Sequence, residues 1–136
     1  MSYATVADLV AEFGEREIRD LTDRADPPAG EIDATVANRA IVRAETTVNG
    51  YLAGRYTLPV PAEAVRGYVL DLARGYLYVS VMNDTVKARY DAAMKDLVSI
   101  GKGLMALPVA PATVPMPTPA ASGMVVRTRP RTFGES

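Results

Sequence analysis

The sequence contains no cysteine and no histidine. The absence of cysteine excludes a disulfide framework and a zinc site with thiolate ligands. The absence of histidine removes the side chain most often used as a general base and as a metal ligand near neutral pH. An enzyme built from this chain would depend on carboxylates, lysine or hydroxyl groups, and no Ser/His/Asp or Cys/His catalytic set can be assembled. We therefore predict no catalytic residue and no enzymatic activity.

The chain also lacks a strong charge imbalance, a long apolar run and a phosphate-binding loop. Its net charge of −1 gives no overall attraction to nucleic acid or to an acidic membrane. The longest strongly apolar stretch, residues 75–83, is too short to span a bilayer. Residues 1–5 have neither the basic nor the apolar region of a signal peptide, and residues 101–103, GKG, follow a predicted helix and lack the Walker spacing. We expect a cytosolic chain as made, with no cofactor and no membrane partner.

At 136 residues, with 49% hydrophobic and 23% charged residues, the chain has the size and composition of one globular domain with a tail. An apolar stripe at steps of three and four within residues 34–53 predicts an amphipathic helix on which the other helices pack. The stripe comprises Val36, Ala37, Ala40, Ile41, Ala44, Val48, Tyr51 and Leu52. Asp33 is a good N-cap for this central helix, and Pro59 and Pro61 end helical propagation after it.

Shorter helical patterns precede and follow the central helix. The helices they predict are residues 5–13, 15–21, 61–82 and 85–100. Thr5 and Asp8 form an approximate capping box, Gly14 is placed to end the first helix in the left-handed conformation, and Asn83 caps the last helix. We therefore predict an all-α fold, a small bundle of four to five helices over residues 1–107.

The carboxylates of the N-terminal half invite a metal-site interpretation. Asp23, Asp26, Glu31 and Asp33 lie in and just after a loop at residues 22–32. Their spacing does not match a helix–loop–helix calcium loop, and Pro27-Pro28 occupies its middle. We predict no metal site and interpret the loop as a solvated turn. The pairs Glu12/Glu15 and Glu15/Glu17 fall on outward helix positions, so we also predict that they are solvated.

The second half of the helix predicted at residues 61–82 is apolar on nearly every side, from Tyr68 to Met82. A helix of this kind is either completely buried or shared with a neighbouring subunit. Complete burial is difficult in a domain with about four short helices. We therefore favour a subunit contact that includes Tyr76 and Leu77 over a core internal to one subunit.

The turn after the central helix, residues 54–61, is a second candidate contact. It presents an arginine, a tyrosine and a leucine, Arg55, Tyr56 and Leu58. The alternative, which the sequence slightly favours, is a rigid turn between helices in which Tyr56 and Leu58 are buried.

The composition changes after Leu107. Residues 108–121 contain five prolines and no charge, which excludes a helix or a central strand. They predict an extended polyproline-like arm of up to about 40 Å, at ~3.1 Å per residue. The arm is either a linker or a segment that docks through Val109, Val114 and Met116. The chain thus divides into a helical domain, residues 1–107, and an arm with a terminal segment, residues 108–136.

Residues 123–131 alternate as a short β-strand would, with three arginines on one face. The predicted helical chain offers no partner strand. The segment therefore either adds to a sheet edge of another molecule or is a frayed basic terminus. Its candidate contact residues are Val125, Val126, Arg127, Arg129, Arg131 and Phe133.

Several strings in the chain resemble the Mu-like bacteriophage neck protein family, also described as a phage domain of unknown function. The most specific is GYLAGRYTLPVP, residues 50–61. The supporting strings are Tyr3-Ala4-Thr5, Asp8-Leu9, Phe13-Gly14-Glu15, Leu21-Thr22-Asp23-Arg24, Ile32-Asp33, Asp71-Leu72-Ala73-Arg74-Gly75-Tyr76-Leu77-Tyr78, Val125-Val126 and Arg131-Thr132-Phe133. The likeness covers residues 3–100 well and the tail loosely.

The resemblance implies a structural virion protein, a head–tail connector or head-completion subunit. Such subunits are expected to form a ring beneath the portal protein, with a dodecamer as the expected state. DNA would pass through the lumen without sequence-specific contact, and the ring would meet the tail terminator or a neighbouring neck protein. The implied location is the neck of the virion, and the host cytoplasm during assembly.

The residues leave one other function open. The chain would then be a nucleic-acid-binding accessory protein that uses Arg127, Arg129 and Arg131 against phosphates. The tail lacks the interleaved aromatic residues and the basic helix typical of such proteins. A small cytosolic enzyme is disfavoured by the absence of histidine and cysteine.

Overall fold

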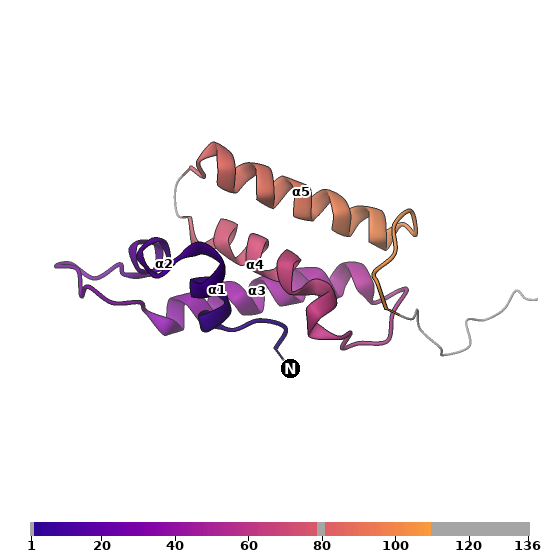
Figure 1. Cartoon of the computed structure of the whole chain (residues 1–136), viewed down its shortest axis with the longest axis horizontal. Helices are drawn as coiled ribbons and strands as arrows, with labels where there is room; N and C mark the ends of the chain where they lie inside the picture. Colours follow the sequence, from indigo (N-terminus) through magenta and orange to yellow (C-terminus); the bar gives the residue numbers. More distant parts are fainter. Residues whose placement is uncertain (1, 79–80, 110–136) are drawn as a thin grey trace, which may run out of the picture.

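The computed structural model describes residues 2–78 and 81–109. In these residues the chain forms five α-helices and no strand (Figure 1). The helices are α1 (Val6–Phe13), α2 (Glu15–Thr22), α3 (Ala34–Leu52), α4 (Ala62–Leu77) and α5 (Asp84–Gly101). The all-α prediction is confirmed for this part of the chain. The predicted arm beyond residue 109 and the predicted terminal strand lie outside the described residues.

Helix α3 is the centre of the bundle, as its apolar stripe predicts. Each of the other four helices packs against it, and α4 does so most extensively. Its inward side buries Ala37, Ala40, Ile41, Ala44, Val48 and Leu52. Figure 1 shows α3, α4 and α5 as the three long helices, with α1 and α2 over the N-terminal part of α3. The short helices therefore cover one end of the bundle and leave the other end to loops.

A buried carboxylate on α3 holds the N-terminal segment in place. Glu45 is 8% exposed, and its Oε2 accepts hydrogen bonds from the backbone N–H groups of Tyr3 and Ala4 at 2.5 and 3.4 Å. These donors have no partner in a helix of their own, so a buried carboxylate satisfies them where water cannot. Tyr3 is buried as a result and joins the core. The polar residue at position 45 breaks the apolar pattern, and periodicity alone did not identify its role.

The predicted helix caps at Thr5, Asp33 and Asn83 are present. Thr5 and Asp8 form a complete capping box, and the side chains of Asp33 and Asn83 each accept a backbone N–H from the first turn of the helix they precede. Gly14 differs from its prediction. Its φ is positive at 95°, but its ψ of 144° is outside the left-handed helical region. It links α1 directly to α2 in a conformation that favours glycine.

Helix α4 is shorter than predicted, and it is covered within the subunit. It ends at Leu77, where Nη2 of Arg24 donates to the terminal carbonyl group at 3.1 Å. Its apolar residues Val65, Val69, Leu70, Leu72, Ala73 and Leu77 are all buried. The part of the predicted apolar stretch that lies in α4 is therefore buried without a neighbouring subunit, contrary to the expectation, whereas Val81 beyond the helix is 86% exposed. The physical reason is that α3 and α5 both pack along α4, and α1 contacts it as well.

Gly75 allows α4 to lie directly against α5. A Cβ atom at this position would lie 2.5 Å from Cδ2 of Tyr90, whose ring is held in an edge-to-face contact with Tyr76. We predict that Gly75→Ala lowers the free energy of unfolding by about 1–3 kcal/mol, because overpacking exceeds the helix propensity gained by alanine. Urea denaturation measures the change. Gly67→Ala on the same helix meets nothing within 4 Å and should be neutral or stabilising. Equal effects of the two substitutions would contradict the close contact.

Candidate functional site

Two segments far apart in the sequence form one end of the bundle. Residues 53–61 join α3 to α4, and residues 102–109 follow α5. Nε of Arg55 donates to the carbonyl oxygen of Gly101 at 3.1 Å, and Oη of Tyr56 accepts from the backbone N–H of Leu107 at 2.9 Å. Figure 1 shows both segments at the end away from α2, where the described chain stops at residue 109. The predicted contact turn therefore lies beside the origin of the predicted arm.

Tyr56 is a structural anchor of this end. Its side chain is 7% exposed and packs with Val60 and Leu107, which are also buried. The turn is held a second time by Tyr3, whose Oη accepts from the Val60 N–H at 3.3 Å and donates to Oδ1 of Asn49 at 2.7 Å. The rigid-turn interpretation is therefore correct for Tyr56. A buried side chain is not available to a partner, so Tyr56 is no longer a candidate contact.

Three exposed apolar side chains remain at the same end. Leu58 is 37% exposed, Leu104 78% and Met105 39%. They are three of the five large hydrophobic residues that are exposed in the described part of the chain. Single exposed apolar residues are ordinary, but grouped ones are typical of interaction sites. We call Arg55, Leu58, Leu104 and Met105 the end surface.

Sequence reasoning missed Leu104 and Met105. The available signal was an apolar pair directly after Gly103, which has a φ of +80° and ends the helical region. A Cβ atom at Gly103 would lie 2.7 Å from the Arg55 guanidinium, so glycine also makes room for Arg55. Residues directly after the end of a helix are commonly polar and solvated. Two large apolar residues at such a place indicate an interaction surface.

Tyr76 and Leu77 do not lie with the end surface. Leu77 is 1% exposed and belongs to the core, so its prediction as a contact residue is wrong. Tyr76 is half-buried: its hydroxyl is 3.0 Å from Oγ1 of Thr47, and the Arg43 guanidinium lies 4.2 Å from its ring centroid. Both residues are near the C-terminal end of α4, whereas the end surface is near the C-terminal ends of α3 and α5.

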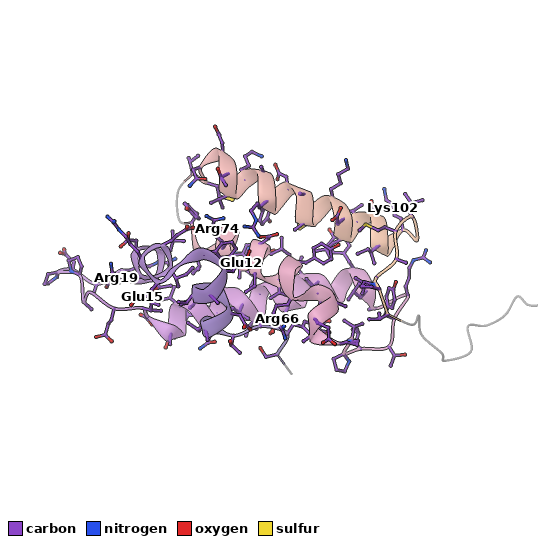
Figure 2. The ribbon with its side chains drawn as sticks, in the orientation of Figure 1. Glu12, Glu15, Arg19, Arg66, Arg74 and Lys102 are labelled. Atoms are coloured by element: carbon purple, nitrogen blue, oxygen red, sulfur yellow. The ribbon has the colours of Figure 1, made fainter. Side chains whose placement is uncertain are left out.

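A cluster of charges joins α1 and α2 to α4 and α5. Arg74 donates to both carboxylate oxygens of Glu17, at 2.6 and 2.9 Å, and its guanidinium lies 4.3 Å from the Phe13 ring centroid. Arg89 contacts Glu12 at 3.2 Å and Oδ1 of Asp71 at 2.9 Å. Figure 2 shows Arg74 and Glu12 in this region. The prediction of solvated carboxylates holds for Glu12 and Glu15, which are exposed, although Glu12 also pairs with Arg89. It is wrong for Glu17, which is partly buried and bonded to Arg74.

Asp71 is the most constrained member of this charge cluster. Burial raises the pKa of its carboxyl group, and the nearby Arg89 guanidinium partly opposes that change. Arg89 lies at ion-pair distance from Oδ1, 2.9 Å, but this buried oxygen has no hydrogen-bond partner of full geometry among the described residues. A raised pKa in the folded state means that this carboxyl group favours folding less when it is ionised than when it is protonated.

The acidic turn after α2 closes on itself. Oδ1 and Oδ2 of Asp23 accept the backbone N–H groups of Ala29 and Gly30 at 3.0 and 2.7 Å, and these hydrogen bonds lower the pKa of the Asp23 carboxyl group. Among the residues that the structure describes, no three acidic side chains are placed to hold a metal ion. In the same residues, no helix is long and apolar enough to cross a membrane.

The remaining candidate contact residues lie outside the described ranges. They are Val125, Val126, Arg127, Arg129, Arg131 and Phe133. The candidate contact surface within the described residues is therefore the end surface, Arg55, Leu58, Leu104 and Met105.

The chain is similar to known phage proteins. A family model described as "Bacteriophage Mu, Gp36" matches residues 3–126, which include all five helices. A curated relative, "Gene product J" of Escherichia phage Mu, is 30% identical over 105 residues. The aligned region covers 76% of this chain and 74% of that protein.

Proposed function

The chain belongs to the bacteriophage Mu Gp36 family, and from this premise we propose that it is a structural protein of the phage neck. In this proposal it is a head–tail connector subunit, also called an adaptor or head-completion protein, and has no enzymatic role. Copies form a ring beneath the portal protein, and the ring joins the capsid to the tail around the DNA channel. The protein is then located in the virion, and in the host cytoplasm before assembly.

The observation that carries the proposal is the exposed apolar group at one end of a well-covered bundle. The long helices hide their apolar sides, since Leu72, Leu77 and Leu97 are all less than 2% exposed. Leu58, Leu104 and Met105 lie outside the helices and are exposed, at the end of the bundle where the described chain stops at residue 109. A protein whose purpose is to be joined to other proteins needs such a surface.

We propose two contacts for this end. Head-to-tail contacts between copies close into a ring when the rotation between them permits it, and the end surface is one side of such a contact. Residues 110–136 reach the next protein, with the portal, the tail terminator or a neighbouring neck protein as acceptor. Val125, Val126 and Phe133 would supply apolar anchors in that segment, and Arg127, Arg129 and Arg131 its charges.

The test is to place charge on the end surface. We expect Leu58→Asp with Leu104→Asp to weaken joining about a hundredfold or more, because two apolar side chains that would be buried at a contact become charged. Joining is measured by electron microscopy of heads and tails mixed with the purified variant. Circular dichroism should show unchanged helix content, since both positions are exposed.

Val42→Asp is the matched control, because Val42 is 59% exposed on α3. It should leave joining unchanged. Normal joining by the Leu58/Leu104 double variant would remove the end surface from the proposal. Absence of the protein from the neck of assembled particles would remove the proposal itself.

A further inference from the structure

Three arginines surround a small hollow near the C-terminal end of α4. The hollow has a volume of about 140 Å³. It is lined by Arg24, Val36, Arg39, Ala40, Arg43, Tyr76 and Leu77. The arginines come from two elements, the turn after α2 and the N-terminal half of α3. We call Arg24, Arg39, Arg43 and the space between them the arginine hollow.

These arginines are positioned without acidic partners. The five ion pairs among the described residues involve Arg66, Arg74, Arg89 and Lys87, and none involves the arginine hollow. Arg24 is held instead by the Leu77 carbonyl oxygen at 3.1 Å. Arg43 is held by the Tyr76 ring at 4.2 Å, a cation–π contact. Three arginines therefore line one hollow, and none of them forms an ion pair with a carboxylate among the described residues.

The Tyr76 hydroxyl keeps this arrangement in place. It lies 3.0 Å from Oγ1 of Thr47, one helical turn beyond Arg43 on α3. The ring that orients Arg43 is thereby fixed to the same helix that carries the arginine. Arg24 uses one N–H group on Leu77 and keeps further donors, because a guanidinium has five. The guanidinium groups of Arg24 and Arg43 are thus oriented while donors remain for a ligand, and Arg39 adds an exposed third group.

We propose that the arginine hollow binds a phosphate group. A phosphate offers several charged oxygens to donors that converge from different directions, and guanidinium forks match its geometry in pairs. The hollow exceeds about tenfold the ~10–15 Å³ that one water requires, so a tetrahedral oxyanion fits. The site lies at positions 24, 39 and 43, separate from the tail arginines and from the end surface.

The proposed neck function supplies the source of the phosphate, and this step of the inference depends on it. In a ring around DNA, the side of the subunit with the N-terminal half of α3 then faces the phosphodiester backbone. The end surface follows the other end of α3, which at ~1.5 Å per residue is about 28 Å long. The helix would therefore separate a DNA-facing side from a side that meets other proteins.

Binding by the purified full chain tests the inference. The variant is Arg39→Gln combined with Arg43→Gln. The control is Lys95→Gln combined with Lys102→Gln, which removes the same amount of charge. Lys95 is exposed on α5, and Lys102 is exposed directly after it. A fluorescein-labelled DNA duplex is titrated at salt concentrations between about 50 and 200 mM. We expect the arginine variant to lose about tenfold or more in affinity and to reduce the salt slope by about 2. The control should change affinity less than about twofold.

Inorganic phosphate is the second probe, and its binding is measured by isothermal titration calorimetry. Loss of phosphate and duplex binding together in the arginine variant supports the site with DNA as the source. Loss of phosphate binding alone supports the site with free phosphate as the source and overturns the orientation toward DNA. Unchanged binding of both probes overturns the site. Unchanged binding with lost self-association or lost portal binding assigns the arginines to an acidic protein surface instead, and also overturns it.

Arg39→Gln alone guards against a folding artefact. In the described residues Arg39 makes no hydrogen bond, ion pair or ring contact that the fold depends on, and its side chain is exposed. It should retain the thermal unfolding temperature and lose about half of the effect on the salt slope. Because binding is measured on the isolated protein and neck function on particle joining, failure of the arginine hollow and failure of the neck proposal give different results.

Discussion

Removal of residues 110–136 is expected to leave the helical domain fully folded and to abolish its joining to other neck proteins. The described core is closed by the segment that precedes the cut. Leu107 is 5% exposed and Val109 packs against the core. The sequence placed the boundary at residue 107, and these two contacts move the cut to residue 109. Helix content by circular dichroism should match that of the full chain, while joining falls below detection by electron microscopy.

A second truncation, after Gly101, is the control for this result. It removes the buried Leu107 side chain and the hydrogen bond from the Leu107 N–H to Tyr56 at 2.9 Å. We expect it to cost about 2–4 kcal/mol of unfolding free energy, from one buried leucine and one buried hydrogen bond. Loss of most helix in the chain cut at 109 would show that the tail completes the fold. Normal joining by that chain would show that the tail is not the connector.

The parts of the fold that sequence predicted are those set by neighbours along the chain. The caps at Thr5, Asp33 and Asn83 depend on residues within three positions, and the stripe of α3 depends on its own spacing. A local signal of this kind is independent of how the helices pack. The family resemblance added the identity of the chain, and the string at residues 50–61 carried it.

The parts that sequence missed depend on contacts between distant positions. Tyr56 and Leu58 are two residues apart, yet Tyr56 is buried and bonded to Leu107, 51 positions away, whereas Leu58 is exposed. Arg24 is 53 positions from the Leu77 carbonyl that it caps. That pairing places Arg24 beside the C-terminal end of α4, where it lines the arginine hollow. Periodicity within one helix contains no information about either.

The burial of α4 is a second example of a feature that depends on contacts between distant positions. The apolar excess of residues 68–82 indicates a surface that needs another subunit. The bundle instead covers the part of it that lies in α4, with α3, α5 and α1, while Val81 beyond the helix is 86% exposed. The short helix α1 matters for this, because it covers part of α4 that an estimate from the number and length of the helices leaves open. One partly buried ion pair, between Glu17 and Arg74, joins α2 to α4.

Arg74→Ala is accordingly expected to lower the free energy of unfolding by about 3–5 kcal/mol. The Arg74 side chain is 11% exposed, and that of Glu17 is 26% exposed. The substitution removes a two-pronged contact and the stacking on Phe13, and it strands a carboxylate in a poorly solvated place. Chemical denaturation measures the loss. Lys87→Ala, which breaks an exposed pair with Asp91 at 2.8 Å, should produce no measurable change.

Removing both charges separates the two origins of this cost. If the stranded carboxylate dominates, Arg74→Met combined with Glu17→Met should recover most of the stability, because a buried ion pair and an apolar pair of similar volume differ little. If lost stacking on Phe13 dominates, the double variant should stay nearly as unstable as Arg74→Ala. A cost for Arg74→Ala no greater than that for Lys87→Ala would contradict both. It would mean that α1 and α2 stay on α4 through apolar contacts such as Leu9 and Ile18, which are 0% exposed.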